Sequence, residues 1–376
     1  MQPRTDAVYR PGLSAGDVFD LITASNIQVS GGAELLDRSL TVLEDISIGL
    51  VSGSVKRGNN DNIHGTCDVV LETELEWGTA LIRPYLRIAI PGPLGIGGRW
   101  NLGAYFTSTP EYVAGAVPRQ FSVQGYDQLE ALKSPVGDSY VTPAGVSYLS
   151  VIESILVAQG FTAYVLDPAR SSTLINQPRS WVLDQNVTWL SVINDLLAAI
   201  GYRGLWADWD GRLRAEPYVP PVARASEWFY DTLVATTIMQ DRTRTQDYFE
   251  APNRWVAVRS NLADGQIPVE GSGVYTFVNQ SAGKTSVDAR GRVITKVLSI
   301  EAADQDALAT TANITIDADL RIDQVFNVTT GPNPMHWHFD RVTLADSEFG
   351  AAVELQETSW TLPLDGSPMS HSWTSV

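Results

Sequence analysis

The sequence has a single cysteine and few basic side chains, and both shortages exclude classes of protein. Cys67 has no partner for an internal disulfide, and there is no CxxC pair or Cys/His cluster of the kind that binds structural zinc. The 376 residues contain 26 Lys and Arg against 43 Asp and Glu, a formal net charge of −17. Since Lys and Arg supply the affinity for phosphate backbones and anionic lipids, we expect neither nucleic-acid recognition nor attachment to an acidic membrane.

Long apolar runs are also missing. No stretch approaches the ~20 consecutive apolar residues of a membrane helix. Residues 1–19, MQPRTDAVYRPGLSAGDVF, lack the apolar core of a cleaved signal peptide. We therefore expect a protein that is made in a reducing cytoplasm, without a signal peptide and without membrane insertion of its own.

The motifs of common enzyme classes are absent as well. There is no GxSxG, no Walker A motif and no HExxH. GIGGRW at 95–100 is rich in glycine but does not lead from a strand into a helix, so it is not a dinucleotide-binding loop. Four histidines are present, and nothing around them marks a Ser-His-Asp triad. We expect no enzymatic activity and no cofactor.

The composition is that of a folded protein. Apolar residues make up 44% of the chain and charged residues 18%, and the length suffices for two or three domains. Eleven tryptophans is a high number. Tryptophan can mark protein interfaces and sugar-binding platforms, but in β-rich proteins it more often forms a large, half-buried anchor.

Most of the chain has the length and alternation of β-strands. Between residues 31 and 125, two strand-like segments flank the turn-rich RGNNDN. In the second of them, IHGTCDVVLETELEWG, one face is apolar and the other carries Glu72, Glu74 and Glu76. Such a row could be a catalytic acid set, a cation site or a solvated face. Glycosidase carboxylates come from different strand ends across a cleft, so catalysis is disfavoured.

A short helix is repeated within the chain. The two copies are SYLSVIESILVAQGF (147–161) and TWLSVINDLLAAIGY (188–202). Each predicts an amphipathic helix that ends at a glycine, and we expect the first to begin at Thr142-Pro143 and the second near Thr188. Each helix is too short to be stable alone in water, so its apolar stripe must pack on the protein. A strand follows each copy.

Strands resume after the Pro-rich segment 218–224, with one more helix near 302–320. The sequence therefore predicts an α+β, mainly β fold with two barrel-like β domains and a helix-containing insert between them. The predicted parts are an N-terminal arm (1–30), a β domain (31–125), an insert with two helix-plus-strand units (126–223) and a C-terminal β domain with one helix (224–376).

Two clusters suggest metal ligands. His336, His338 and Asp340 have an HxHxD spacing, and on a strand all three would point the same way. Without a second cluster of ligands in the sequence, we favour a polar strand face and expect no metal. Asp208 and Asp210 could suggest calcium, but the rest of an EF-hand loop is lacking and a hairpin turn explains both residues.

The order of several segments resembles the tail hub proteins of long non-contractile-tailed phages, also called minor tail or baseplate hub proteins, most like those of actinobacterial phages. The segments are WNLGAYFTSTP, RQFSVQGYDQLEAL, SYVTPAGVSYLSVIESILVAQGF and TWLSVINDLLAAIGYRGLWADWDGRLRAEPYVPP. The resemblance covers about residues 40–376, and its most specific part is LLAAIGYRGLWADWDGRLRAEPY.

The resemblance implies a structural protein of the virion, located at the tail tip. There a homotrimer would form a ring that contacts the distal tail protein, the tape-measure protein and other tail-tip or central fibre proteins. Phage DNA would pass through the ring without specific binding. The helical units would then be insertions that decorate the ring. The alternative function is a carbohydrate-binding module that contacts the host cell wall, which the tryptophans and the acidity would suit.

An acidic channel wall would repel DNA phosphates instead of trapping them. We therefore hypothesise that Glu72, Glu74 and Glu76 line the lumen of the ring. An outer, solvated face is the alternative, because strand alternation determines that the three share a side but not which side faces the lumen.

Overall fold

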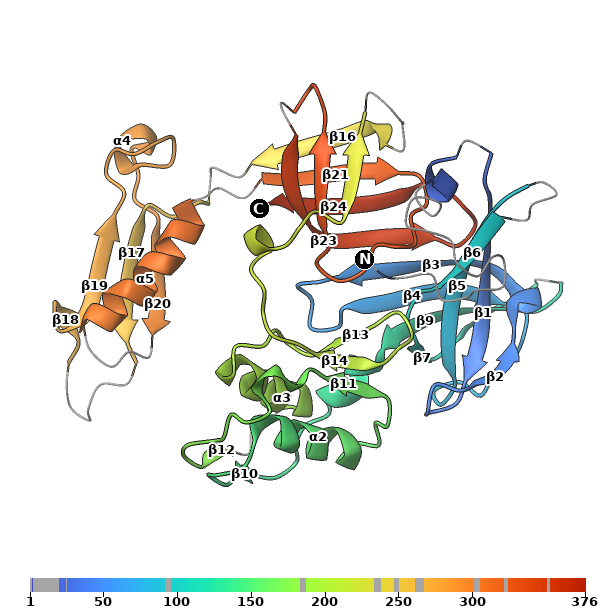
Figure 1. Ribbon diagram of the computed structural model, residues 1–376, viewed down its shortest axis with the longest axis horizontal. Helices are drawn as coiled ribbons and strands as arrows, with labels where there is room; N and C mark the ends of the chain where they lie inside the picture. Colours follow the sequence, from blue (N-terminus) through green and yellow to red (C-terminus); the bar gives the residue numbers. More distant parts are fainter. Residues whose placement is uncertain are drawn as a thin grey trace. The chain divides into compact units, whose positions relative to one another are not determined.

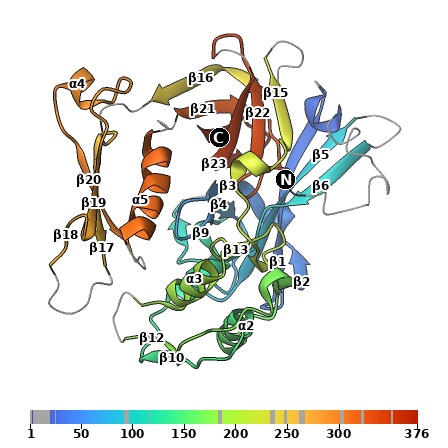
Figure 2. The same ribbon diagram turned by 60° about the vertical axis from the view of Figure 1, so that its left-hand side comes forward.

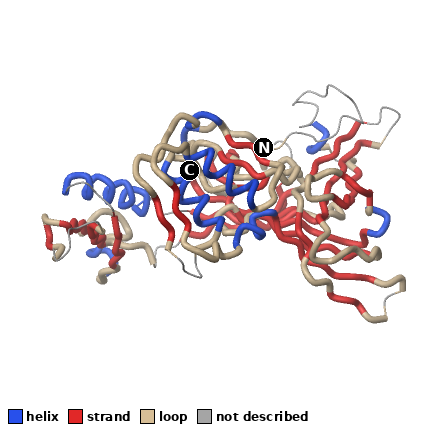
Figure 3. The backbone as a smooth tube through the Cα atoms, turned by 90° about the horizontal axis from the view of Figure 1, so that it is seen from below, coloured by secondary structure: helices blue, strands red, loops and turns tan. Residues whose placement is uncertain are grey.

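The fold is mainly β with few helices, as Figure 3 shows, and this confirms the predicted α+β class. The computed structural model describes residues 2, 20–24, 26–91, 96–115, 117–182, 187–232, 238–246, 250–260, 267–300, 305–320, 324–349 and 352–376. Most of the predicted arm lies outside these residues. The chain forms two compact units, residues 1–242 with 327–374, and residues 243–326. None of the described helices has the length and apolarity that a membrane span needs.

The first unit is built on a 15-stranded sheet that takes strands from both ends of the sequence (Figure 1). The main path runs β16-β21-β24-β23-β3-β4-β9-β7-β5-β1-β2. The earlier strands are β1 (Gln28–Leu36), β2 (Val42–Asp45), β3 (Leu50–Gly58), β4 (Gly65–Leu71), β5 (Leu81–Ile90), β6 (Ile96–Asn101), β7 (Tyr105–Thr107), β8 (Glu111–Val113) and β9 (Gln120–Asp127). The later strands are β15 (Trp228–Asp231), β16 (Ile238–Gln246), β21 (Gln324–Thr330), β22 (Arg341–Ala345), β23 (Val353–Pro363) and β24 (Met369–Ser375).

The two ends of the sequence meet at β3 and β23. These strands pair antiparallel, with Ser359 opposite Gly58 and Pro363 opposite Ser54. A single hydrogen-bonded sheet therefore joins segments about three hundred positions apart in the sequence. How the chain divides into the four predicted domains stays a prediction.

The acidic segment departs from its prediction, because only its first part is a strand. β4 ends at Leu71, and Glu72, Glu74 and Glu76 lie in the loop that follows. The reason lies in the neighbours: Leu71 pairs with Leu50, where β3 begins, and with Phe121, one residue inside β9, so the ladder on both sides of β4 ends there. The Glu72 N–H still donates to the Gly49 carbonyl at 2.7 Å, but no strand continues beyond it. The alternation of burial continues nevertheless, with the three carboxylates exposed.

The repeated helices are confirmed as α2 (Tyr148–Ala158) and α3 (Trp189–Ala199). α3 begins next to Thr188, as predicted, and the Thr188 hydroxyl caps it by accepting a hydrogen bond from the backbone N–H of Ser191. The chain turns after each helix through a glycine with positive φ, Gly160 at 83° and Gly201 at 72°.

The predicted start of the first helix is wrong. Thr142 ends the short strand β10 (Tyr140–Thr142), which pairs with β12 (Arg179–Trp181), and α2 begins only after Ser147. Pairing with a strand therefore takes Thr142 and the proline after it out of the helix. An additional turn of 3₁₀ helix, η2 (Gln128–Lys133), is capped by the Asp127 side chain.

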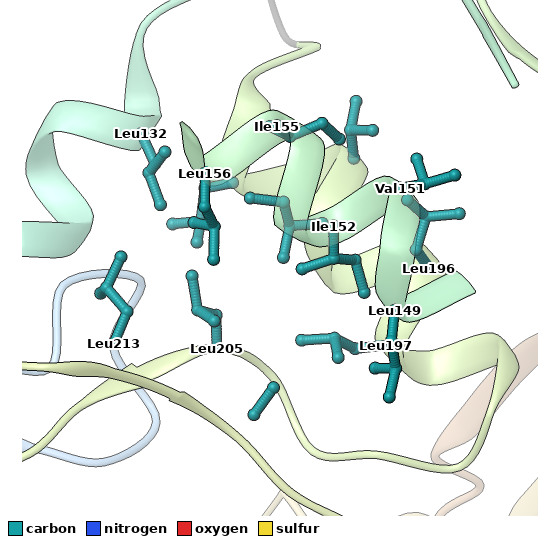
Figure 4. Packing of buried hydrophobic residues seen from close by; sticks show 14 of the residues in the cluster. Leu132, Leu149, Val151, Ile152, Ile155, Leu156, Leu196, Leu197, Leu205 and Leu213 are labelled. Carbon is teal, nitrogen blue, oxygen red and sulfur yellow. The ribbon is translucent and has the colours of Figure 1, made fainter. Parts of the chain in front are cut away.

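Both helices pack their apolar stripes into one core, as Figure 4 shows. Equivalent positions of the repeat are buried alike, since Ile152, Leu156, Ile193 and Leu197 are each 0% exposed. A small sheet completes this core, with strands β11 (Tyr164–Leu166), β13 (Trp206–Ala207) and β14 (Leu213–Ala215). The repeat thus serves packing.

The second unit is a four-stranded sheet with one helix on its face (Figure 2). Its elements are β17 (Arg254–Arg259), β18 (Val269–Glu270), β19 (Gly273–Val278), α4 (Val287–Arg290), β20 (Thr295–Ile300) and α5 (Gln305–Leu320). The predicted helix near 302–320 corresponds to α5, with residues 302–304 outside the described part. Trp255 is fully buried under α5, and its Nε1–H donates to Asp319 at 2.7 Å.

Candidate functional site

The HxHxD segment lies in a loop, so its prediction as a strand face is wrong. Residues 331–340 connect β21 to β22, and the sequence there begins Gly-Pro-Asn-Pro, in which two residues lack the N–H that a strand ladder needs. Asp340 Oδ2 instead accepts a hydrogen bond from the Trp337 backbone N–H at 2.7 Å. His336, His338 and Asp340 are all buried, at 0%, 7% and 2% exposure.

His338 joins a group centred on Arg57. The Arg57 side chain is 2% exposed, with Nη2 at 3.0 Å from His338 Nδ1 and Nε donating to Asn59 Oδ1 at 3.1 Å. Its guanidinium carbon lies 4.7 Å from the ring centre of Trp337. The His338 ring stacks on Trp206 at 4.6 Å. Loop 331–340 is therefore tied to β3 on one side and to the helical insert on the other.

Burial determines the charge states in this group. Removal from water lowers the pKa of Arg57 to about 10, so the guanidinium stays charged. Burial, with the charge of Arg57 as a second cause, lowers the pKa of His64 to about 3 and that of His338 well below its usual value. The neutral imidazoles of His64 and His338 therefore lie near the buried, charged guanidinium of Arg57. A cavity of about 370 Å³ adjoins them, lined in part by His64, His338 and Arg203.

His336 lies in a second group with two residues that the sequence analysis missed. They are Glu357 on β23 and His371 on β24, and one ligand atom of each of the three lies within 4.8 Å of the others. Among the described residues this is the group of His, Cys, Asp and Glu side chains with metal-like spacing. Residues so distant in sequence give no spacing signal, since only the pairing of β23 with β24 brings Glu357 and His371 together.

The Asp208–Gly211 segment forms the predicted hairpin turn between β13 and β14. Asp208 Oδ1 accepts hydrogen bonds from the backbone N–H groups of Asp210 and Arg212, and its Oδ2 pairs with Arg214 Nε at 2.6 Å. Gly211 has a positive φ of 91°. These contacts explain Asp208 without a bound calcium ion.

The acidic segment borders a groove of about 600 Å³. Glu74 and Glu76 line it together with Asp37 and Glu44 from the β1–β2 hairpin. The exposed Leu43 of β2 lines it too. The structure thus extends the acidic row of the sequence by two more carboxylates.

Searches with the sequence find neither a matching family model nor a curated relative. Comparison of structures does find similar folds. The tail protein from Neisseria meningitidis MC58 has a TM-score of 0.62 at 11% identity, over 92% of this chain and 97% of that chain. The 43 kDa tail protein of prophage MuSo2 from Shewanella oneidensis has a TM-score of 0.61 at 10% identity, over 92% and 98%.

A chain of the half-lidded Francisella PdpA-VgrG complex is similar as well. It has a TM-score of 0.58 at 8% identity, over 93% of this chain and 58% of that chain. Identities this low establish a common fold and nothing more. This chain therefore has the fold of the two tail proteins, matched over nearly their whole length, and shares it with part of the longer chain in the PdpA-VgrG complex.

Proposed function

We propose that this chain is a structural protein of the phage virion, the hub at the tip of a long, non-contractile tail. The observation that carries the proposal is the fold shared with two tail proteins over 92% of this chain and almost all of theirs. The hub joins the tail tube and distal tail protein to the tape measure and to the fibre that contacts the host. Enzymatic activity has no part in this role.

We propose further that three copies form a ring. The path of the large sheet has two ends, β2 and β16, and edge strands of this kind pair readily with another chain. All four residues of β2 are exposed, with Leu43 at 61%, and the neighbouring Ile48 is 100% exposed. Apolar side chains on and near an edge strand suit burial against a second copy.

The tryptophans, which were the main argument for the alternative of a carbohydrate-binding module, do not favour it in the structure. All eleven tryptophans lie in the described part of the chain, and each of them is buried or half-buried. Four of the eleven, Trp100, Trp255, Trp360 and Trp373, are fully buried. A sugar platform needs aromatic faces that reach solvent, so the interpretation of the tryptophans as anchors is favoured.

The first test of the hub is the mass and negative-stain shape of the purified protein, alone and mixed with the product of the neighbouring tail gene. We expect a ring of three subunits with a central channel. A monomer under both conditions would contradict the hub.

The edge at β2 gives a prediction about assembly. Replacing Leu43 and Ile48 by Asp places two charges where the second copy would bury apolar surface. We expect the mass to fall from trimer to monomer with an unchanged circular dichroism spectrum, since both side chains are exposed in the single chain. Val141→Asp is the matched control, because Val141 is 58% exposed but lies on β10 of the insert. Loss of the trimer in the control as well would contradict an interface at β2.

The acidic residues give a prediction about DNA passage. We propose that Glu72, Glu74 and Glu76 face the lumen, and that changing all three to Lys leaves the ring intact but slows DNA ejection, because the wall then attracts phosphate. Ejection is measured by dye fluorescence from virions carrying the triple variant, and the slowing should diminish at high salt.

The same change to Lys at Glu130, Glu153 and Asp195 in the insert is the control. An unchanged ejection rate in the triple variant would contradict the proposal that the three glutamates face the lumen.

A further inference from the structure

Three buried side chains from separate segments converge at one point of the large sheet. His336 comes from loop 331–340, Glu357 from β23 and His371 from β24, and they are 0%, 0% and 4% exposed. We propose that they bind one divalent transition-metal ion, with Zn²⁺ as the ion that their two imidazoles and carboxylate suit. This inference does not depend on the proposed function.

The two imidazole rings are oriented as metal ligands are. Each ring is held by its far nitrogen: His336 Nε2 lies 2.7 Å from the Tyr230 hydroxyl, and His371 Nε2 lies 2.9 Å from the Thr330 hydroxyl. Metal binding needs the tautomer in which Nε2 donates to the hydroxyl and Nδ1 keeps its lone pair. Without the ion, the hydrogen bond of His371 Nδ1 to Glu357 places the proton of that ring on Nδ1, so binding would move it to Nε2. Both Nδ1 atoms face Glu357, at 3.3 and 2.9 Å from its Oε2.

Two of the distances between ligand atoms are those expected around a tetrahedral ion. Zinc bonds of about 2.0–2.2 Å place neighbouring ligand atoms about 3.3–3.6 Å apart. His336 Nδ1 lies 3.3 Å from Glu357 Oε2 and 3.4 Å from Asp340 Oδ2. The ligand atoms of His336, Glu357 and His371 are up to 4.8 Å apart, so the ion would draw them together, and Asp340, next to His336, is the candidate fourth ligand. The distance of 2.9 Å between His371 and Glu357 is that of a hydrogen bond and would lengthen by a few tenths of an ångström around the ion.

Unsatisfied atoms point to a missing partner in the same place. His336 Nδ1 and Glu357 Oε1 are buried and have no hydrogen-bond partner among the described residues, although polar atoms of such burial almost always have one. The ion-pair partners found for Glu357 in the described part of the chain are the two histidines, which carry charge only when protonated. A bound cation would give His336 Nδ1 a partner and would compensate the negative charge of the buried Glu357 carboxylate.

The proposed ion would connect loop 331–340 to the paired strands β23 and β24. It would fasten loop 331–340 to the last two strands of the sheet, close to the Arg57 group that holds the other side of the same loop. Its role is therefore structural, as in closed zinc sites whose ligands all come from the protein.

The test is made on the full chain, prepared without an affinity tag and dialysed against a chelator. Zn²⁺ alone is titrated in, and Co²⁺ is used as a spectroscopic substitute. We expect one ion per chain, a rise in melting temperature with Zn²⁺, and Co²⁺ absorption bands typical of a tetrahedral site. Absence of binding, or octahedral Co²⁺ bands, would overturn the proposal without any variant.

Variants locate the ion. His371→Gln and His336→Gln should each weaken Zn²⁺ binding at least about 100-fold and abolish the Co²⁺ bands, while Tyr230→Phe should weaken binding about 10–100-fold by releasing the His336 ring. His64→Gln is the control, since His64 lies outside the group, and it should bind like the wild type. Circular dichroism establishes that each variant is folded. Equal Zn²⁺ binding by the wild type and the two ligand variants would overturn the proposal.

Discussion

Arg57→Met is expected to lower the free energy of unfolding by about 2–5 kcal/mol at pH 7. The substitution keeps a long apolar side chain but removes the charge and the donors. Asn59 Oδ1 and His338 Nδ1 then lose their contacts with the guanidinium, and Trp337 loses the cation above its ring. Lys56→Met is the control, because Lys56 is the neighbouring residue of β3 with its side chain exposed, and it should cost less than about 0.5 kcal/mol.

The loss in free energy of unfolding caused by Arg57→Met should be smaller at pH 5 than at pH 7. Burial raises the pKa of Asp127 to about 6, and the charge of Arg57 works against that rise. An acid whose folded pKa lies above its unfolded value of about 3.9 costs stability as the pH rises through that interval, and loss of Arg57 raises the folded pKa further. Below pH 6 the carboxyl is protonated in both proteins, so this part of the difference disappears.

Urea unfolding followed by tryptophan fluorescence measures these differences at both pH values. Trp255 is the one tryptophan in residues 243–326, so the signal reports mainly on the first unit. A deficit at pH 7 below 1 kcal/mol, or one that grows at pH 5, would show that Arg57 does not organise the buried group.

Leu156→Ala and Leu197→Ala are each expected to cost about 3–5 kcal/mol. The two leucines occupy equivalent positions of the repeat and are both 0% exposed in the core that α2 and α3 share. Removing three side-chain carbons there loses apolar burial and leaves a cavity that a well-packed core closes only in part. The unfolding midpoint of each variant in urea, compared with that of the wild type, measures the loss.

The matched control is Val157→Ala, one residue along α2. Val157 is 57% exposed, so we expect a change within about 0.5 kcal/mol. The repeat predicts similar losses for the two leucines. A small loss at one leucine and a large loss at the other would mean that one copy of the helix lies outside the cooperative core, against the packing in Figure 4.

Features set by neighbouring residues could be predicted from the sequence. The sequence predicts the stripes of α2 and α3, the start of α3 near Thr188, the final glycines and the turn at Asp208, because all of them depend on contacts within a few positions. The burial of tryptophan could be inferred from alternation with polar neighbours for the same reason.

Features set by distant partners could not be predicted. β4 ends at Leu71 because the neighbouring strands β3 and β9 begin at or close to its partners there, and α2 begins late because Thr142 pairs with Arg179. The His336 group needs Glu357 and His371, which no local spacing connects to it. Of the candidate metal site, the sequence pattern therefore identified His336 and Asp340 but neither Glu357 nor His371.

The pairing of β3 with β23 also has a consequence for the timing of synthesis. Lys56 lies opposite Thr361, so β3 leaves the ribosome about three hundred residues before its neighbour exists. At about 5–20 residues per second this delay is roughly 15–60 s. Throughout it the edge of β3 is open to pairing with other nascent chains, and the Arg57 group lacks loop 331–340. A chaperone that covers this edge during translation would therefore raise the yield of folded protein more than one that acts after release.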